Sequence, residues 1–584
     1  MMKKTKIVCT VGPSTDAFGI LPKMIAAGMN VARFNFSHGS HEEHAIRIGM
    51  VRTAARQSQS HVALMLDTRG PEMRLGNFIE GKVVIEQGQK FILTSREVDG
   101  TKDICSVNHK FLPQEVVPGN EILLSDGLIT LSVERVDGND IHTTVLNTGV
   151  IGNRKRVAVP GVSVNLPPLS EQDIKDVLFA TAEDMDFIAA SFIQRAADVL
   201  TIRKLLEDVN SHIHIISKIE NKEGVKNIDE IIKVSDGIMV ARGDLGVEIP
   251  TEEVPIVQKM IIEKCNKAGK PVITATQMLE SMTVNPRPTR AEASDIANAI
   301  LDGTDAIMLS GETASGLYPV EAVATMGRIA IRTEEALPYK ELLRRKGLFL
   351  QNTTTDAISH ATVQVAHQLE AAAIITATES GYTSRMVSKY RPKAVIIAVT
   401  PKETTARLVQ LLWGVHPVIG NRYQNSDEMV QNAELCSLQA GVIQDGDLVI
   451  ITAGVPTGTS GTTNLIRVHV VGTILLRGTG IGQQIVTGKV CIAHSYEDMV
   501  RKFQPGDVLV VSGIDDENAL LASKAGAIVA EEGGLTSQAA IVGISYNIPV
   551  IVNAENTLGM LKDGEIVTVD AARGLVYQGK INAK

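Results

Sequence analysis

The sequence predicts an α/β protein whose largest part is a (β/α)8 barrel, a closed ring of parallel strands each followed by a helix. First, eight short apolar runs rich in β-branched residues recur before residue 311, each followed by a helical pattern. Second, aromatic residues make up only 3% and there are 49 glycines, so Ala, Val, Ile and Leu must build the cores, as in buried parallel sheets. Third, 584 residues at about 150 per domain allow roughly four domains.

The spacing of the eight runs predicts one large insertion. The runs are Lys6–Thr10, Met29–Phe36, Val62–Asp67, Phe187–Ser191, His212–Ile219, Gly237–Ala241, Pro271–Thr276 and Asp305–Ser310. The third run ends at residue 67 and the fourth at residue 191, whereas every other pair of neighbouring ends is 22 to 35 residues apart. The third strand–helix unit therefore contains an extra segment of about 95 residues, the size of a small domain. We expect the barrel to comprise residues 1–69 and 168–343.

The inserted segment, residues 70–167, has the pattern of an antiparallel β domain. Apolar and polar residues alternate in Lys82–Ile85, Ile122–Leu124 and Ile129–Val133, and Gly and Asn-Asp turns separate these runs. The segment leaves the barrel at the carboxyl ends of the strands, where active sites of this fold lie. We expect this segment to cover an active site at that end of the barrel, and we call it the lid domain.

Two further domains follow the barrel. Residues 344–475 alternate strands with helices and predict a second α/β domain, with strands at Ala372–Thr378, Val395–Thr400, Val415–Ile419, Asp447–Thr452 and Leu465–Val471. Arg477–Gly482 has the composition of a glycine-rich linker. Residues 476–584 contain further short strands, at Val508–Val511, Ala527–Val529, Val550–Val552 and Ile566–Val569.

Helix-start signals support the barrel. Ser40–Glu43 and Thr289–Glu292 both match the capping box, in which Ser or Thr accepts from the amide three residues on and Glu accepts from the capping residue's amide. The second helix is expected to stop at Gly303, a suitable C-cap.

Charge and cysteine content narrow the class of protein. There are 57 Lys and Arg against 66 Asp and Glu, a formal net charge of -9, which weakens a nucleic-acid-binding role. The five cysteines are odd in number and form no CxxC, so we expect neither disulfides nor a cysteine zinc site, and a cytoplasmic location. No apolar run approaches the length of a membrane span, so we expect no membrane partner.

Polar residues follow the predicted barrel strands, and they would meet at one mouth of the barrel. They include Arg33, Asn35, Ser37, Asp67, Thr68, Ser191, Lys218, Glu220, Arg242, Asp244 and Thr276. Glu220 and Asp244 suit Mg²⁺ or Mn²⁺, which prefer oxygen ligands. A clamp for phosphate would be formed by three cations, Arg33, Lys218 and Arg242. A cage for a larger monovalent cation would be formed by four neutral or singly charged residues, Asn35, Ser37, Asp67 and Thr68. The pattern predicts a phosphoryl-transfer site. The alternative is a set of buried ion pairs that closes the barrel end.

Long motifs at these positions resemble the pyruvate kinase family. They are Asn35–Gly39, Asp67–Arg74, Ser217–Asn221, Ala241–Gly246, Ala275–Met282 and Pro286–Glu292, and the resemblance spans residues 3 to about 475. It implies a homotetrameric enzyme that transfers the phosphoryl group of phosphoenolpyruvate to ADP, giving pyruvate and ATP.

The resemblance also implies residue roles. Lys218 matches the lysine that stabilises the transferring phosphoryl group, and Glu220 and Asp244 match the ligands of Mg²⁺. The K⁺ site is matched by Asn35, Ser37, Asp67 and Thr68. Arg33 matches a contact to the substrate phosphate, and Gly243, Asp244 and Thr276 match groups that hold the substrate carboxylate, with Thr276 near the carbon to be protonated. Arg74 and Lys155 match contacts to the nucleotide phosphates. Family members that do without K⁺ have a lysine at the position of Glu72, so we expect K⁺ dependence.

Thr376–Thr383 is a candidate effector site, because hydroxyls and amides at a helix N-terminus bind phosphate. The alternative is an ordinary Ser/Thr turn. The family resemblance implies an effector phosphate at Thr378, Ser380 and Thr383. AMP or ribose 5-phosphate is favoured over fructose 1,6-bisphosphate, because Ser437–Gly441 offers no second basic anchor and Glu379 adds repulsion.

The last hundred residues resemble the swivelling phosphohistidine domain of phosphoenolpyruvate-utilising enzymes, through Glu532–Val542. Gln538 stands where that family has its phosphorylated histidine, which argues against a phosphotransferase that works through a histidine. We expect a structural or assembly role for this domain. A catalytically silent sensor would need Lys218, Glu220 or Asp244 replaced, and all three are present.

Overall fold

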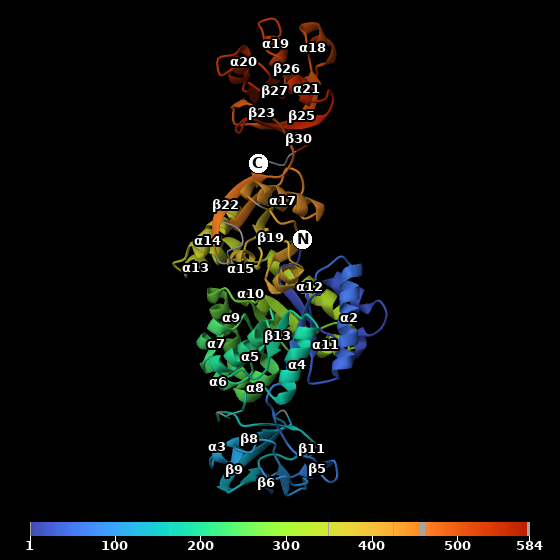
Figure 1. Ribbon diagram of the computed structural model, residues 1–584, viewed down its shortest axis with the longest axis vertical. Helices are drawn as coiled ribbons and strands as arrows, with labels where there is room; N and C mark the ends of the chain where they lie inside the picture. The colour runs from blue at the N-terminus through green and yellow to red at the C-terminus, as the bar shows by residue number, and fades with distance from the viewer. Residues whose placement is uncertain are drawn as a thin grey trace. The chain divides into compact units, whose positions relative to one another are not determined.

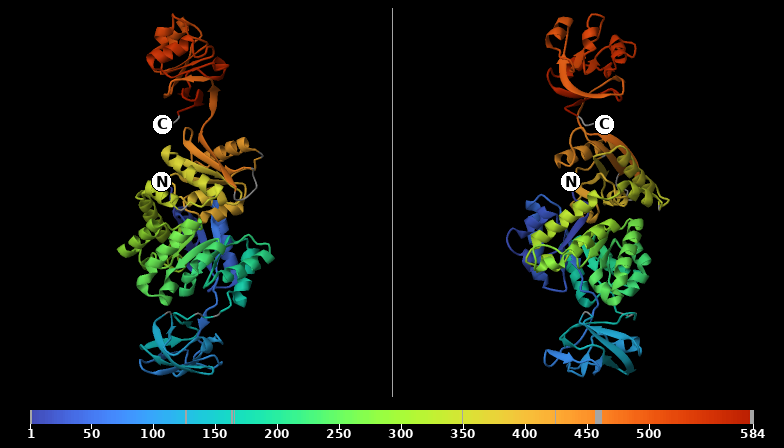
Figure 2. Two further views of the ribbon diagram at one scale, coloured as in Figure 1. Left: turned by 90° about the vertical axis from the view of Figure 1, so that its left-hand side faces the viewer. Right: turned by 180° about the vertical axis from the view of Figure 1, so that it is seen from behind.

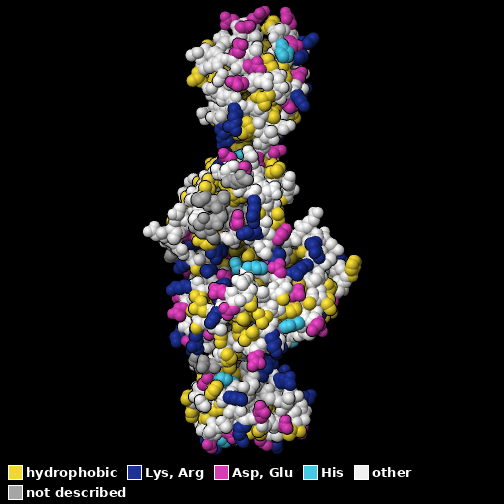
Figure 3. All heavy atoms as spheres, in the orientation of Figure 1, with side chains coloured by type: hydrophobic (Ala, Val, Ile, Leu, Met, Phe, Trp, Pro, Cys, Tyr) yellow, Lys and Arg dark blue, Asp and Glu magenta, His cyan; other side chains and the backbone are white. Residues whose placement is uncertain are grey.

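The computed structural model describes residues 2–125, 127–162, 164, 166–348, 350–423, 425–455 and 462–580. The chain divides into two compact units. One comprises Met1–Gln351, Glu379–Arg391 and Lys402–Pro417, and the other Asn352–Thr378, Pro392–Pro401 and Val418–Lys584. Within the described ranges, every helix is too short or too polar to cross a bilayer. On the face drawn in Figure 3, basic and acidic side chains are intermingled.

The first unit contains the predicted barrel. Eight strands close in the order β1-β17-β16-β15-β14-β13-β3-β2, and every neighbouring pair is parallel. Their bounds are β1 Lys6–Thr10, β2 Val31–Asn35, β3 Ala63–Asp67, β13 Phe187–Ala190, β14 His214–Ile219, β15 Gly237–Ala241, β16 Val272–Ala275 and β17 Ala306–Leu309. Each overlaps a predicted run, so the prediction of a TIM barrel is confirmed (Figure 1).

Helices surround the barrel strands. They are α1 Ile20–Ala27, α2 His41–Gln57, α4 Glu171–Ala182, α5 Ala196–Asp208, α6 Lys222–Lys226, α7 Ile228–Val234, α8 Arg242–Glu248, α9 Val254–Ala268, α10 Arg290–Asp302, α11 Gly311–Ala314, α12 Pro319–Glu335 and α13 Tyr339–Gly347. Both predicted capping boxes form, at Ser40 before α2 and at Thr289 before α10. Helix α10 ends at Gly303, whose φ of 103° is open to glycine but strained for other residues.

The inserted lid domain is almost entirely strand, as Figure 2 shows. Its elements are β4 Met73–Arg74, β5 Lys82–Ile85, β6 Lys90–Thr94, β7 Ile104–Ser106, α3 Leu112–Glu115, β8 Glu121–Leu124, β9 Ile129–Asp137, β10 Asp140–Val145, β11 Gly149–Gly152 and β12 Arg156–Ala158. A sheet in the order β4-β12-β8-β9-β10-β6-β7 is antiparallel except at β6–β7, and β11 pairs with β5 antiparallel. The antiparallel pattern predicted for this segment is confirmed.

The second unit contains two α/β sheets. In the first, β19 Val395–Thr400, β18 Ala373–Ala377 and β21 Leu448–Gly454 are parallel, and β22 Thr463–Val470 adds an antiparallel edge. Helices α14 Thr354–Gln368 and α17 Ser426–Gln439 belong to the same unit. The predicted residues 344–475 also contain α15 Tyr382–Ser388, α16 Glu403–Leu408 and β20 Val415–Ile419.

The C-terminal sheet has the order β23-β30-β29-β25-β26-β27-β28-β24. Its elements are β23 Ile474–Arg477, β24 Thr479–Ile481, β25 Ile485–Ile492, α18 Tyr496–Lys502, β26 Val508–Val511, α19 Ala519–Ala522, β27 Ala527–Ala530, α20 Gln538–Tyr546, β28 Val550–Val552, α21 Thr557–Met560, β29 Ile566–Asp570 and β30 Leu575–Gln578. The overall fold class is as predicted, whereas the domain boundaries at residues 70, 167, 343 and 475 stay predictions.

The glycine-rich linker expected at Arg477–Gly482 is wrong, because β23 and β24 occupy it. These glycines serve close packing and not flexibility. A Cβ on Gly480 would lie 1.8 Å from the carbonyl oxygen of Ala571, and one on Gly478 would lie 2.6 Å from that of Val552. Only glycine permits backbones to approach so closely.

Candidate active site

Strands β2, β3 and β14 bring the predicted polar residues together. Asn35 and Asp67 are register partners on β2 and β3, at the carboxyl ends of parallel strands. Lys218 lies in β14, and Glu220 is the first residue after that strand. Six of the ring residues are at most 8% exposed: Arg33, Asp67, Thr68, Ser191, Lys218 and Glu220. The mouth of the barrel therefore contains closely packed charged side chains with little exposure to solvent.

Lys218 lies at the centre of this set. Its ammonium nitrogen donates to Asp67 Oδ1 at 2.9 Å and to Ser191 Oγ at 2.7 Å, and it pairs with Glu220 Oε1 at 3.0 Å. Burial acts to lower the pKa of Lys218, but the charges of Asp67 and Glu220 outweigh it and raise that pKa above its ordinary value. Lys218 is therefore a fixed positive charge at neutral pH.

Arg33 is fixed in the same network. Its Nε donates to Asp67 Oδ2 at 2.6 Å, and its Nη1 donates to Thr10 Oγ1 at 2.8 Å. Burial favours a raised pKa for Asp67, but Arg33 and Lys218 together bring that pKa below its usual value. One ionised carboxylate thus orients two cations toward the same space.

Glu220 and Asp244 are the two carboxylates predicted to bind a divalent cation. Glu220 Oε2 accepts from the amide of Phe192 at 2.7 Å. Burial raises the pKa of Glu220, and the negative charge of Asp244 raises it further against the opposing effect of Lys218. The two carboxylates thus repel each other across a shared space, and a divalent cation there would relieve this repulsion. Their oxygen donors fit Mg²⁺ or Mn²⁺. In the described ranges, no group of three or more His, Cys, Asp or Glu is placed to hold a metal.

Arg156 is a candidate functional residue that the sequence reasoning missed. Its guanidinium pairs with Asp244 and lies 4.9 Å from the centre of the Phe192 ring. Its side chain is 10% exposed, whereas its neighbour Lys155 is exposed. Arg156 is the first residue of β12, whereas Arg154 and Lys155 precede the strand and are exposed, so the basic run in the sequence carried no signal that separates the three. Arg156 therefore connects the lid domain to Asp244, one of the two carboxylates predicted to bind the divalent cation.

Thr276 is held in a strained turn after β16. It has a φ of 65°, unusual for a β-branched residue, and its Oγ1 accepts from the amide of Gly243 at 2.8 Å. Arg242 braces this turn: Nη2 donates to the Thr276 carbonyl at 2.6 Å, and Nη1 pairs with Asp295 at 2.8 Å. The expectation that Arg242 joins the phosphate clamp is therefore not supported, because its donors serve the protein backbone and Asp295.

The four residues predicted to hold K⁺ lie on two neighbouring strand ends. Asn35 Oδ1 accepts from the amide of Ser37 at 3.1 Å, and Thr68 Oγ1 accepts from the amide of Ser191 at 3.1 Å. Ser191 also donates to the Thr68 carbonyl at 2.7 Å, so it fixes both Thr68 and Lys218. All four side chains offer oxygen, which suits an alkali cation.

The two predicted nucleotide contacts lie in the lid domain. Arg74 pairs with Glu72 and donates to the carbonyl of Arg154 at 2.9 Å. Strand β12 pairs with β4 with Arg156 opposite Arg74, so Lys155 is adjacent to the same pairing. Arg74 therefore lies in β4, and Lys155 lies directly before β12.

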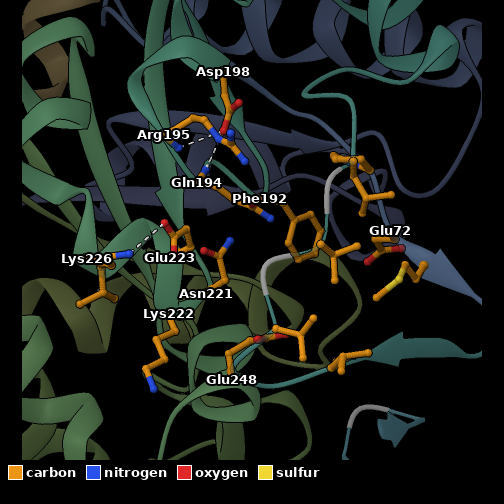
Figure 4. Close-up of a pocket in the computed structure, with 18 of the residues that line it drawn as sticks. Glu72, Phe192, Gln194, Arg195, Asp198, Asn221, Lys222, Glu223, Lys226 and Glu248 are labelled. Carbon is orange, nitrogen blue, oxygen red and sulfur yellow. Dashed lines mark hydrogen bonds and ion pairs between the residues drawn. The ribbon is translucent and has the colours of Figure 1, made fainter. Parts of the chain in front are cut away.

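A cavity of about 910 Å³ adjoins the ring (Figure 4). The lid domain contributes Glu72 and Arg156, and the barrel contributes Phe192, Arg195 and Lys222 among others. Inside it, Asp198 accepts from the amide of Arg195 at 3.0 Å. None of the predicted catalytic, substrate, nucleotide or metal residues lines this cavity, so its size alone would have misplaced the site.

The predicted effector residues have different environments. Thr378 follows β18 and is buried, Ser380 is exposed, and Thr383 is buried in the first turn of α15. Glu379 pairs with Lys402 at 3.1 Å, so its charge is balanced and its expected repulsion of a bisphosphate is weakened.

The C-terminal domain has no imidazole at its predicted loop. Gln538 begins α20, and its Nε2 donates to Asp516 Oδ1 at 2.9 Å. His494 is exposed and lies between β25 and α18. Strands β26 and β27 separate it from Gln538 in the sequence.

Comparisons with known proteins agree with this geometry. Three family models match: "Pyruvate kinase, barrel domain" over residues 2–323, "Pyruvate kinase, alpha/beta domain" over residues 356–469, and "PEP-utilising enzyme, mobile domain" over residues 503–574. The chain is 53% identical to a pyruvate kinase of Geobacillus stearothermophilus and 52% identical to one of Bacillus licheniformis, over 99% of each chain in both cases. The crystal structure of a pyruvate kinase from Cryptosporidium parvum aligns with a TM-score of 0.77 and 42% identity, covering 80% of this chain and 96% of that one.

Proposed function

The chain belongs to the pyruvate kinase family and transfers the phosphoryl group of phosphoenolpyruvate to ADP in the last step of glycolysis, and from that premise we propose which residues carry the transfer. The observation that carries the proposal is the Lys218 ammonium, held by Asp67, Ser191 and Glu220. A cation fixed in advance stabilises the charge that develops on a transferring phosphoryl group without reorganisation during the reaction.

Arg33 and Lys218 bind the phosphoryl group of the substrate from one side. Both are oriented by Asp67, so the two cations keep a constant spacing. Glu220 and Asp244 hold Mg²⁺ or Mn²⁺, which supplies further neutralisation of phosphate charge when bound. Asn35, Ser37, Asp67 and Thr68 hold K⁺ beside them. Arg74 and Lys155 bind the nucleotide phosphates, and the lid domain excludes water from the transfer.

The amide of Gly243 and the hydroxyl of Thr276 receive the substrate carboxylate, and Asp244 lies beside them. The Gly243 amide donates to Thr276 Oγ1 at 2.8 Å, and the Thr276 hydroxyl donates to the Ala275 carbonyl at 2.6 Å. The two groups therefore lie side by side, and a substrate carboxylate would take over both donors from these internal acceptors. Thr276 then lies next to the enolate carbon, where a proton must be delivered after transfer. The strained φ of Thr276, braced by Arg242, keeps the hydroxyl in place.

We extend the proposal to regulation, assembly and location. A phosphorylated effector, AMP or ribose 5-phosphate, binds at Thr378, Ser380 and Thr383. The enzyme is a homotetramer in the cytoplasm. Five free and buried cysteines in the described chain support a reducing compartment.

The test is a coupled assay for pyruvate with and without K⁺, at fixed Mg²⁺ and ionic strength. We expect activity to fall at least about ten-fold when tetramethylammonium replaces K⁺. Glu72→Lys should lose much of this dependence, because a tethered ammonium replaces the cation. Glu80→Lys, at an exposed position of the same domain, is the matched control and should keep it. Equal activity of the wild type in both salts would overturn the K⁺ assignment.

A further inference from the structure

A second group of cations lies at the amino ends of the barrel strands, away from the catalytic mouth. A small open pocket there is lined by Lys270, Arg385, Lys389 and Arg391, and by a single carboxylate, Asp305. Lys270 precedes β16, Asp305 precedes β17, and Arg385 lies in α15. All five residues belong to the first compact unit. Four positive charges thus face one negative charge.

The single carboxylate is already used. Arg391 Nη1 pairs with Asp305 Oδ1 at 2.7 Å, and both side chains are at most 6% exposed. Arg391 Nη2 donates to the carbonyl of Gly303 at 2.8 Å, but its Nε is buried without a hydrogen-bond partner. Asp305 therefore neutralises Arg391, and it is the one carboxylate among the described residues that line the pocket.

Arg385 is the most exceptional member of the group. Its Nε is buried without a partner, and across the described ranges its guanidinium makes no side-chain hydrogen bond or ion pair. Its one ring contact is with Tyr382, whose centre lies 5.1 Å away. A buried donor without an acceptor costs stability, so a guanidinium in this state indicates a missing anionic partner.

The pKa directions agree with an excess of positive charge. Burial lowers the pKa of Arg385, and burial together with the charge of Arg385 lowers the pKa of Lys270. Lys346, which donates to Asn266 Oδ1 at 2.6 Å beside the pocket, has its pKa lowered to about 7 by burial and by Arg391 and Lys389, against the opposing effect of Asp305. An anion would relieve this mutual repulsion.

We propose that this pocket binds a phosphate dianion, either as the free ion or as the end group of a phosphomonoester. The planar guanidinium of Arg385 supplies donors in the geometry that a phosphate accepts, and Lys270, Lys389 and Arg391 supply charge. The bound anion would join α15 to the start of β16, two segments more than a hundred residues apart in sequence. The site shares no residue with Thr378, Ser380 and Thr383, and it does not depend on the effector proposal.

The test is titration calorimetry of the full chain with sodium phosphate at constant ionic strength. The variants are Arg385→Gln and, as control, Arg344→Gln, whose guanidinium lies on α13 with an 80% exposed side chain. We expect the wild type and the control to bind one more phosphate per chain than Arg385→Gln. Phosphate sites at the catalytic mouth are common to all three proteins, so the difference isolates this pocket. Equal stoichiometry and affinity in the wild type and Arg385→Gln would overturn the proposal.

Thermal denaturation provides a second readout. In phosphate-free buffer Arg385→Gln should melt close to the wild type, because the substitution removes only the ring contact with Tyr382 and, within the described part of the chain, no side-chain hydrogen bond or ion pair. Phosphate should raise the Tm of the wild type and the control by more than that of Arg385→Gln. An equal rise in all three, or the same rise from chloride at matched ionic strength, would contradict a specific site. Displacement of phosphate by ribose 5-phosphate would assign the ligand as an ester, and no displacement would assign it as the free ion.

Discussion

The barrel mouth and the loop before α20 both resemble parts of proteins that use phosphoenolpyruvate, but only the first keeps the groups that the chemistry needs. At the mouth, Lys218 and Arg33 are both held by Asp67. At the start of α20, Gln538 donates its amide to Asp516. An amide is neither a fixed charge nor a nucleophile at neutral pH. A shared fold therefore says little about activity, which depends on the side chains at the site.

The largest expected effect follows from removing the fixed charge at the mouth. Lys218→Met should lower kcat by about a thousand-fold or more, because the lysine acts on charge that develops in the transition state. Phosphoenolpyruvate should still bind, since Arg33 and the amide of Gly243 remain. Steady-state kinetics and direct substrate titration measure the two quantities separately. Lys204→Met, at an exposed position of α5, is the control. A Lys218→Met enzyme that keeps a tenth of wild-type kcat would refute the role.

A smaller effect is expected at the lid side of the mouth. Arg156→Gln should lower kcat/KM by about ten-fold to a hundred-fold, because Asp244 loses the cation that positions it. Arg154→Gln, in the same basic run but exposed, should change little. Lys155→Gln should raise the KM for ADP with little effect on phosphoenolpyruvate. If Arg154→Gln and Arg156→Gln behave alike, the basic run acts only through its net charge.

The sequence predicted the eight barrel strands and most of the mouth because both depend on local patterns. Buried parallel strands are apolar and β-branched, and residues that follow them must meet at one end. The direction of individual side chains could not be predicted in the same way. Arg242 and Arg156 are both basic residues near Asp244, yet Arg242 braces the backbone at Thr276 whereas Arg156 pairs with Asp244. Only the packing of distant elements decides between these outcomes.

The glycine-rich stretch near residue 480 illustrates a second limit. Glycine serves both flexible linkers and close backbone contacts, and composition does not separate the two. The contact that requires Gly480 is made by Ala571, about 90 residues later in the chain. Non-local contacts of this kind are invisible to a pattern read along the sequence.

Regulation is expected to change substrate affinity more modestly than the active-site variants change turnover. AMP or ribose 5-phosphate should lower the phosphoenolpyruvate concentration at half-saturation by about five-fold or more, a typical coupling between sites. Ser380→Ala should weaken this response without changing the rate at saturating substrate, since Ser380 is exposed and outside the mouth. Strong activation by fructose 1,6-bisphosphate, with none by the two monophosphates, would contradict the choice of ligand. Because Glu379 pairs with Lys402, it repels a bisphosphate less than a free carboxylate would, so all three ligands belong in the same titration.

The smallest effect on activity is expected from removing the C-terminal domain, because the barrel already contains the groups for direct transfer to ADP. A chain that ends at Thr473, before β23, should keep its pyruvate kinase activity but melt at a lower temperature. The physical reason is a small apolar cluster in which Val470 packs with Tyr577, so truncation exposes Val470.

The complementary measurement uses the full chain, incubated with labelled phosphoenolpyruvate and quenched in base. We expect no acid-labile label on residues 474–584, because Gln538 cannot form a phosphohistidine and His494 lies outside the loop. Label on this domain, or loss of activity on truncation without loss of folded barrel, would show that the two regions share the chemistry after all.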